Sequence, residues 1–160
     1  MAGLLIWAFS PLIAHVISQP FQRKVWKLAA DDKQWLRLVA RNTWSYFETY
    51  VGPRTNWLPP DNFQEYPEDK LAERISPTNE GLFLVSGLIA RDFGYLGLYA
   101  WLDLCEKNLA VWSRLPQLKG HFYNWYETAT LQPLMPRYVS TVDSGNLAAS
   151  LLVLAQGTAE

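Results

Sequence analysis

The sequence predicts an all-α fold, and three observations lead to this prediction. Apolar residues recur every three or four positions in several long segments, which is the period of a helix with one buried face. Ser76-Pro77 is a typical helix start, and Gly52-Pro53 is a typical helix stop. No segment of useful length shows the alternation of apolar and polar residues that a half-buried strand requires.

The first helix is expected from Asp31 to about Tyr50, with Asp31 or Asp32 as its cap. Five residues recur at helical spacing and are expected to form its buried face: Leu36, Val39, Thr43, Phe47 and Tyr50. A serine hydroxyl at position 76 can accept hydrogen bonds from exposed amides, so a second helix is expected from there to about Asp92.

Two more helices are expected further along the chain. The pair Phe93-Gly94 indicates a tight corner, after which a third helix is expected from about Leu96 to Leu115. A fourth is expected to begin near Ser144, with Asp143 as a candidate cap, and to continue through an apolar run.

The lengths of the connections predict where a binding cleft would lie. If neighbouring helices are antiparallel, the short corner at residues 93–94 lies at one end, and the connections 52–75 and 116–143 both lie at the other. Long loops are uncommon in compact domains unless they are functional. Two of them over helical hairpins predict a cleft like that at one end of an α-toroid.

Composition excludes several classes of function. The 160 residues suit one domain, and the net charge of -1 removes the electrostatic basis for binding nucleic acid. The single Cys105 cannot form an internal disulfide, and His121 has no neighbouring Cys or second His. We therefore expect no metal site and no cofactor.

The apolar run Gly3–Ile17 leaves two interpretations open. It is shorter than the roughly 20 residues that span a bilayer, and its positive charges come after it, unlike those of a signal peptide. It is either a surface helix or the C-terminal end of a transmembrane helix, and we favour the latter. Arg23, Lys24 and Lys27 would then place the rest of the chain on the cytoplasmic side.

The two long loops combine aromatic rings with carboxylates and amides. Rings stack on the C–H faces of sugars, while polar groups take sugar hydroxyls, the mixture expected of a ligand pocket. The alternative is a packed loop whose polar groups serve its own backbone, and helix capping is the more ordinary role for Asp143. The candidate binding residues are Trp57, Asp61, Asn62, Glu65, Asn79, Trp125, Asp143 and Asn146.

Several blocks, in the correct order, resemble the cyclic β-1,2-glucan synthase family. They are RNTWSYFETYVGP (41–53), NWLPPDNFQE (56–65), SPTNEGLFLVS (76–86), ARDFGYLGL (90–98) and GHFYNWYETATLQPLMPRYVSTVDSGNLA (120–148). That family comprises multi-pass membrane enzymes with a UDP-glucose-dependent glycosyltransferase, a glycoamylase-like (α/α)6 domain and a phosphorylase-like region. The resemblance covers nearly the whole chain.

The resemblance implies a division of the chain into three parts. Residues 1–19 would end a transmembrane or membrane-associated helix at the bacterial inner membrane, residues 20–30 would be a linker, and residues 31–160 would begin the glycoamylase-like domain on the cytoplasmic side. About four helices would form part of the toroid, and the remainder of the synthase would complete it.

The resemblance also implies what the chain does. The glycoamylase-like domain is implied to transglycosylate and cyclise β-1,2-glucan, with its catalytic glutamates beyond Glu160. No catalytic residue is therefore assigned in this chain, which would be inactive alone. The implied cleft rim is formed by Asp61, Asn62, Asn79, Trp125, Asp143 and Asn146. Two alternatives remain: a non-catalytic carbohydrate-binding or scaffold module, and an interaction protein whose apolar N-terminus docks on a partner.

Overall fold

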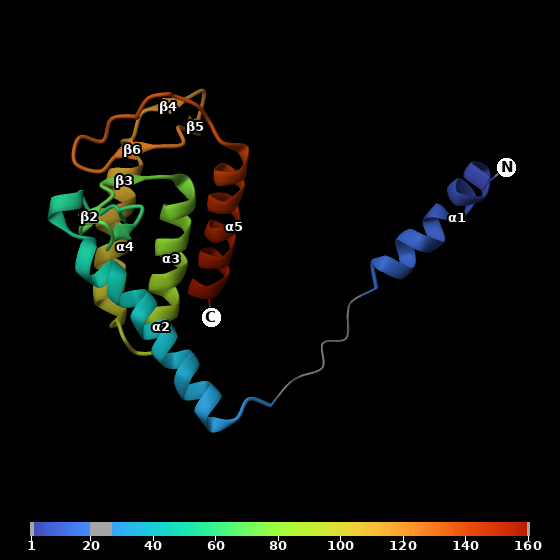
Figure 1. Cartoon of the computed structure of the whole chain (residues 1–160), viewed down its shortest axis with the longest axis horizontal. Coiled ribbons are helices and arrows are strands. Elements are labelled where there is room, and N and C mark those ends of the chain that lie inside the picture. Colours follow the sequence, from blue (N-terminus) through green and yellow to red (C-terminus); the bar gives the residue numbers. More distant parts are fainter. Residues whose placement is uncertain (1, 20–26, 160) are drawn as a thin grey trace. The chain divides into compact units, whose positions relative to one another are not determined.

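The computed structural model describes residues 2–19 and 27–159, and it divides into two compact units, Met1–Lys33 and Gln34–Glu160. In the first unit, α1 spans Ala2–Ile17 and contains Pro11 (Figure 1). No helix within the described ranges is long and apolar enough to cross a membrane. Most of the expected linker, including Arg23 and Lys24, lies outside the described residues, and residues 27–29 have no regular secondary structure.

Four helices form the body of the second unit. They are α2 (Ala30–Tyr50), which belongs to this unit from Gln34 on, α3 (Pro77–Asp92), α4 (Leu98–Trp112) and α5 (Thr141–Thr158). Figure 1 shows successive helices running in opposite directions, so both long connections lie at one end, as the sequence predicts. We call residues 51–76 and 113–140, which meet at this end, the loop layer.

The strands are all short and all belong to the loop layer. They are β1 (Phe63–Gln64), β2 (Lys70–Leu71), β3 (Arg74–Ile75), β4 (Gln117–Leu118), β5 (His121–Phe122) and β6 (Tyr126–Glu127), with a 3-10 turn at Pro53–Thr55. They pair antiparallel as β1–β2, β3–β6 and β4–β5. Of these ladders, β3–β6 joins the two long connections to each other.

Helix starts and ends differ from the sequence-based expectation in two places. The fourth helix begins at Thr141, three residues earlier than expected, because the Ser140 hydroxyl accepts a hydrogen bond from the backbone N–H of Asp143 at 3.1 Å. Asp143 therefore lies inside the first turn, so the prediction that it is the cap residue was wrong. The third helix is shorter than expected, spanning Leu98–Trp112.

The buried face predicted for the first helix was partly wrong. Leu36 and Val39 are 45% and 41% exposed, and Thr43 is also exposed, whereas Phe47 and Tyr50 are partly buried. The reason is visible in Figure 1, where the first half of α2 extends beyond the other three helices of its unit. Trp44 is the residue of α2 that enters the core.

The core of the second unit consists of two clusters. The cluster nearer the loop layer contains Leu58, Ile75, Val111, Trp112, Leu115, Tyr126 and Leu147. The other contains Trp44, Phe83, Leu84, Leu88, Ala90 and Trp101. Three tryptophans are thus core residues, which is the commonest role of large aromatic side chains.

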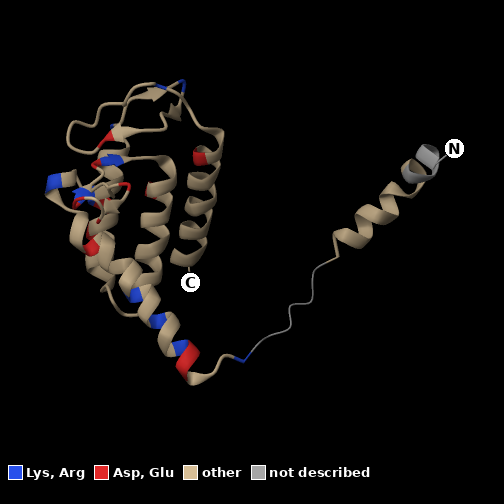
Figure 2. Ribbon diagram, viewed as in Figure 1, with Lys and Arg blue, Asp and Glu red and all other residues tan. Residues whose placement is uncertain are grey.

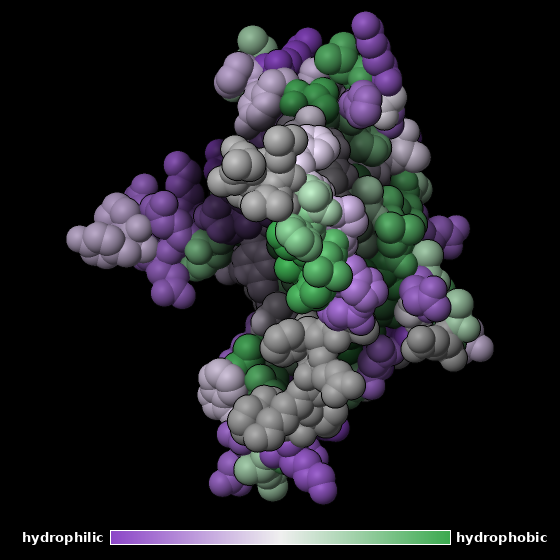
Figure 3. Space-filling model, turned by 90° about the vertical axis from the view of Figure 1, so that its right-hand side faces the viewer, coloured by the Kyte–Doolittle hydropathy of each residue, from purple (hydrophilic) through white to green (hydrophobic). Residues whose placement is uncertain are grey.

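Much apolar surface on the helices is nevertheless exposed. On α5, Leu152 and Val153 are 74% and 51% exposed, and on α3 Leu82 is 55% exposed. Hydrophobic side chains, coloured green, reach the surface on the side of the molecule drawn in Figure 3. Asp143 is the single charged residue of α5, as Figure 2 shows. A helix that is apolar on all sides is typical of a fully enclosed position in a larger core.

A buried acid joins α3 to α4 beneath the loop layer. The Glu80 side chain is fully buried, and Asn108 Nδ2 donates to its Oε2 at 3.2 Å and to the carbonyl of Trp57 at 2.9 Å. Burial raises the pKa of Glu80 from its ordinary value near 4.5 to about 8, although the Asn108 hydrogen bond acts in the opposite direction. Glu80 is therefore largely protonated at neutral pH.

The pKa of Glu80 predicts how stability depends on pH. Between about pH 4.5 and 8 the folded chain holds a proton that the unfolded chain has released, so the free energy of unfolding falls as pH rises. The slope is at most about 1.4 kcal/mol per pH unit. Glu80→Gln should remove this contribution, so variant and parent should diverge progressively from pH 5 to 8 in urea unfolding. If the unfolding free energies of parent and variant changed in parallel with pH, the raised pKa of Glu80 would be wrong.

A close approach of α3 to α4 gives a second prediction. A Cβ on Gly87 would clash with the ring of Trp101, whereas one on Gly145 would meet nothing within 4 Å. Gly87→Ala should therefore cost about 1–3 kcal/mol of unfolding free energy through overpacking. Gly145→Ala, the matched helical control, should be neutral or stabilising by up to about 1 kcal/mol. Equal effects in thermal denaturation would refute this packing.

Candidate functional site

The two halves of the loop layer are held together by main-chain pairing. In the β3–β6 ladder, Arg74 pairs with Glu127 and Ile75 with Tyr126. Asn56 Nδ2 also donates to the carbonyls of Thr128 at 2.7 Å and Ala129 at 3.0 Å. The first and second long connections therefore form one surface above the helices.

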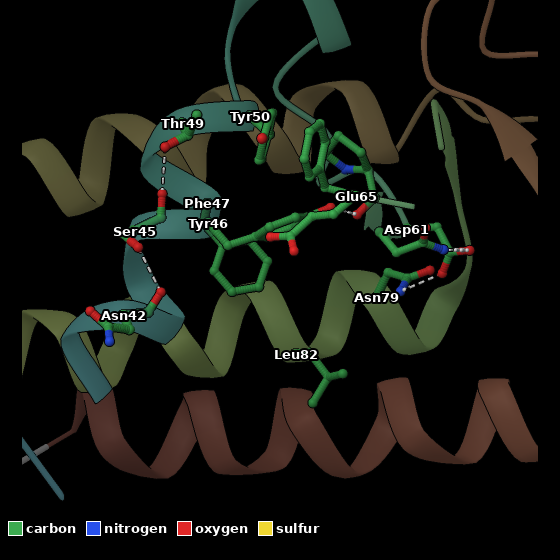
Figure 4. A pocket seen from close by; sticks show the side chains of 13 residues that line it. Asn42, Ser45, Tyr46, Phe47, Thr49, Tyr50, Asp61, Glu65, Asn79 and Leu82 are labelled. Atoms are coloured by element: carbon green, nitrogen blue, oxygen red, sulfur yellow. Dashed lines mark hydrogen bonds between the residues drawn. The ribbon is translucent and has the colours of Figure 1, made fainter. Parts of the chain in front are cut away.

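A pocket of about 620 Å³ opens where α2, the first connection and α3 meet. Figure 4 shows α2 on one side of the pocket, with Asp61 and Asn79 on the opposite side and joined by a hydrogen bond. The lining residues are Asn42, Ser45, Tyr46, Phe47, Thr49, Tyr50, Pro60, Asp61, Asn62, Phe63, Glu65, Asn79 and Leu82.

Aromatic rings form the apolar wall of this pocket. Tyr50 stacks on Phe63 with a centroid distance of 5.3 Å, and the ring centroids of Tyr46 and Tyr50 are 5.1 Å apart. The Tyr46 hydroxyl donates to the Pro60 carbonyl at 3.0 Å, which ties α2 to the first connection. Burial, with the nearby charge of Asp61, raises the pKa of Tyr46 to about 12, so it remains a hydrogen-bond donor.

Asp61 is the centre of the polar side of the pocket. Its Oδ1 accepts from Asn79 Nδ2 at 3.3 Å, and its Oδ2 accepts from Asn62 Nδ2 at 3.0 Å and from the Arg74 guanidinium. Asn79 in turn accepts from the Ser76 N–H at 2.9 Å. Asn79 therefore completes the capping box of α3 and also faces the pocket.

A second polar cluster lies at the N-terminal ends of α3 and α5. Thr78 donates to Asp143 Oδ1 at 2.7 Å and accepts from Asn146 Nδ2 at 3.1 Å. Burial acts to raise the pKa of Asp143, but hydrogen bonds from Ser140, Thr78 and Ser76 outweigh it, and the pKa lies below its ordinary value. Asp143 is therefore a carboxylate whose oxygens are already hydrogen-bonded.

Asn124 links this second cluster to Trp125. The Asp143 carboxylate can only accept and the Trp125 indole N–H can only donate, which fixes the orientation of the buried Asn124 amide. Its Nδ2 donates to Asp143 Oδ2 at 2.8 Å, and its Oδ1 accepts from Trp125 Nε1 and the Tyr138 hydroxyl, both at 2.8 Å.

The two tryptophans expected to stack on sugars each have a cation over one ring face. The Arg74 guanidinium lies 4.4 Å from the Trp125 ring centroid, and Lys107 Nζ lies 4.5 Å from that of Trp57. Both rings belong to the loop layer. This agrees with the alternating directions of the helices, which place both long connections at one end. Trp57, however, packs toward α4 through Lys107 and Asn108, and it does not line the pocket.

The structure brings together most of the residues predicted from the sequence. Asp61, Asn62, Glu65 and Asn79 line the pocket, and Trp125, Asp143 and Asn146 belong to the adjoining cluster, but Trp57 does not join them. No group of three or more His, Cys, Asp or Glu that could hold a metal occurs among the residues described.

Sequence reasoning missed the contribution of α2 to the pocket. Asn42, Ser45 and Thr49 recur every three or four residues, so they share one polar face of that helix. This spacing is the one feature of the sequence that could have indicated the contribution of α2. It does not by itself indicate a site, because a polar helix face is ordinarily just the face in contact with solvent.

Solved structures define the class of fold. A candidate glucoamylase from Bacteroides fragilis matches with a TM-score of 0.68 and 23% identity, over 86% of this chain and 33% of that one. An endo-β-1,2-glucanase from Chitinophaga pinensis, solved with sophorotriose and glucose, matches with a TM-score of 0.60 and 18% identity, over 79% of this chain and 31% of that one. At these identities the likeness shows fold alone. The described helices match part of a glucoamylase-like (α/α)6 domain.

The sequence comparison is more specific. No family model matches the chain. It is, however, 46% identical over 151 residues to cyclic β-(1,2)-glucan synthase NdvB of Rhizobium meliloti (strain 1021), which is 94% of this chain and 5% of that protein. The chain is thus homologous to a short segment of that synthase, and the resemblance identified from the sequence is confirmed.

Proposed function

We propose that the chain forms part of the rim of a β-1,2-glucan-binding cleft in the glycoamylase-like domain of a cyclic β-1,2-glucan synthase. The observation that carries this proposal is the 620 Å³ pocket, which has an aromatic wall on one side and carboxylate and amide groups on the other. Carbohydrate sites need both components. The homologous synthase and the sophorotriose-bound structural neighbour support β-1,2-glucan as the substrate class.

The side chains of the pocket have different roles in this proposal. Glu65 is exposed, lines the pocket and is available to accept hydrogen bonds from sugar hydroxyls. Asn42, Ser45 and Thr49 offer further polar groups from α2. Tyr50 and Phe63 provide the apolar surface against which a pyranose ring packs.

In this proposal the described residues supply binding groups, and we assign no acid–base pair to them. The carboxylates of Asp61 and Asp143 already accept several hydrogen bonds each, and those to Asp143 hold its pKa below its ordinary value. A general acid for glycosidic cleavage needs a raised pKa and access to the substrate, and Glu80, whose pKa is raised, is fully buried. Transglycosylation and cyclisation are therefore assigned to groups elsewhere in the synthase, and this chain alone is expected to be inactive.

The exposed apolar surface of α5 supports an incomplete toroid over a free-standing binding module. Val142, Leu152 and Val153 are more than half exposed on a helix that packs along α3. Further helical hairpins of the same domain would cover this surface. The proposed partner is therefore the remainder of the synthase.

We also propose that α1 associates with the bacterial inner membrane and that the second unit lies on the cytoplasmic side. Trp7, Phe9, Leu12 and Val16 are more than half exposed on this helix. Exposed apolar helices of this kind bind the boundary between lipid headgroups and acyl chains.

Sophorotriose binding tests the proposed site. Glu65→Ala should weaken binding about tenfold in isothermal titration, because it removes charged hydrogen-bond acceptors. Glu106→Ala, an exposed carboxylate on α4, is the control and should bind as the parent does. Absence of binding by the parent chain, or equal affinities of all three proteins, would refute the proposal.

The same proteins should release no reducing ends and no cyclic products from linear β-1,2-glucan. Turnover that disappears in Asp143→Asn or Glu65→Gln would show that the working carboxylates are among these 160 residues. It would overturn the assignment of catalysis to other parts of the synthase.

Sedimentation with vesicles of phosphatidylethanolamine and phosphatidylglycerol tests the role of α1. The full chain should sediment with the vesicles, and a chain lacking residues 1–20 should remain in the supernatant. Circular dichroism should show that the shortened chain keeps the helices of the second unit. Undiminished vesicle binding, or a collapse of the helical signal, would contradict a membrane role for α1.

A further inference from the structure

Arg74 connects the two polar regions of the site, although neither its charge nor its position suggested a role from the sequence. Its main chain is fixed in the β3–β6 ladder opposite Glu127. Its Nε and Nη2 donate to Asp61 Oδ2 at 3.1 and 2.9 Å. The central carbon of the guanidinium, Cζ, lies over the Trp125 ring, 4.4 Å from its centroid. One side chain thus contacts a carboxylate of the first connection and a ring of the second.

These two contacts depend on the shape of arginine as well as its charge. A guanidinium is planar, so it can donate along its edge to a carboxylate while its face stacks on an aromatic ring. A lysine ammonium can pair with the carboxylate, but it has no flat face and no fixed pair of donors. The arrangement therefore distinguishes arginine from lysine at position 74.

Trp125 is held from two directions. Its indole N–H donates to Asn124 at 2.8 Å, which fixes the ring edge, and Arg74 covers one ring face. Because Arg74 covers one face of the indole, a sugar could stack only on the other. Asp61 is restrained in the same way, because Arg74 holds one carboxylate oxygen while Asn79 holds the other.

We propose that Arg74 is a positioning residue, which orients Trp125 and Asp61 so that the two connections present one continuous sugar-binding surface. This inference rests on the proposed function. Arg74 acts through Trp125 and Asp61 and makes no contact of its own with the glucan. A preorganised Trp125 ring loses less conformational freedom when the sugar binds, so the entropic cost of binding is smaller and the affinity is higher.

Arg74→Lys tests the proposal, with Arg54→Lys as the matched control. Arg54 is also an arginine of the loop layer paired to a carboxylate, with Nη2 2.7 Å from Glu73 Oε1. Arg74→Lys should weaken sophorotriose binding about fivefold in isothermal titration, the affinity equivalent of one exposed cation–π contact. Arg54→Lys should leave the affinity unchanged. Equal affinities of parent and Arg74→Lys would overturn the proposal.

A double-mutant cycle separates positioning from direct contact. If Arg74 acts mainly through Trp125, Arg74→Lys should cost much less than fivefold in a Trp125→Ala background. Additive losses would mean that Arg74 touches the sugar itself, and the positioning role would be wrong.

A measurement without ligand distinguishes failure of this inference from failure of the proposed function. In NMR spectra, the indole N–H signal of Trp125, assigned by its absence in Trp125→Phe, should exchange faster with water in Arg74→Lys and not in Arg54→Lys. An unchanged exchange rate refutes positioning, whatever the binding results. If the signal exchanges faster in Arg74→Lys but the parent chain does not bind sophorotriose, Arg74 does position Trp125, and the proposed glucan-binding function is wrong.

Discussion

The pairing of Arg74–Ile75 with Tyr126–Glu127 is the contact on which the rest of the site depends. Ile75 and Tyr126 are both fully buried, and both belong to the core cluster nearer the loop layer. Because side chains alternate across a strand, a register slip of one residue would expose these two side chains and bury the charged ones beside them. The apolar contact therefore fixes the register, and the register fixes how two long connections meet.

Residues 74–76 link the register of the β3–β6 ladder to the pocket. Arg74 points away from the core toward Asp61 and Trp125, while Ile75 points into the core. Ser76 then ends the strand and caps α3, with its hydroxyl accepting from the N–H of Asn79 at 3.3 Å. Since Asn79 also donates to Asp61, the start of α3 and the polar side of the pocket form together.

Local sequence signals predicted the helices well, because their caps and stops are local. Ser76-Pro77 was sufficient to place the start of α3, and the parity of the helices placed both long connections at one end. The start of α5 was misplaced because Asp143 and Ser140 are both good capping residues, and their mutual hydrogen bonding is decided in three dimensions.

The site was predicted less completely, because long-range contacts decide which polar groups remain available. Nothing in the sequence around Trp57 shows that Lys107 covers its ring, or that Asn108 binds its carbonyl. The role of Arg74 likewise depends on a strand pairing between two-residue segments, too short to produce an alternating pattern. Glu65 was predicted from the proline-led segment of the first connection, and it lines the pocket.

The exposed apolar surface of α5 suggests that the same further helices would complete both the fold and the site. The pocket and the polar cluster beside it lie at the loop layer, whereas Asp143 is the single charged residue of α5 and Leu152 and Val153 of that helix are exposed. Covering that apolar surface with further hairpins would stabilise the domain by burying it, at about 25 cal/mol per Å². The same hairpins would bring their own loops to the end where the pocket opens. In the proposed synthase domain, packing against α5 and closing the glucan cleft are therefore one event. A substitution on the exposed face of α5, far from any sugar, should then weaken glucan binding by the complete domain.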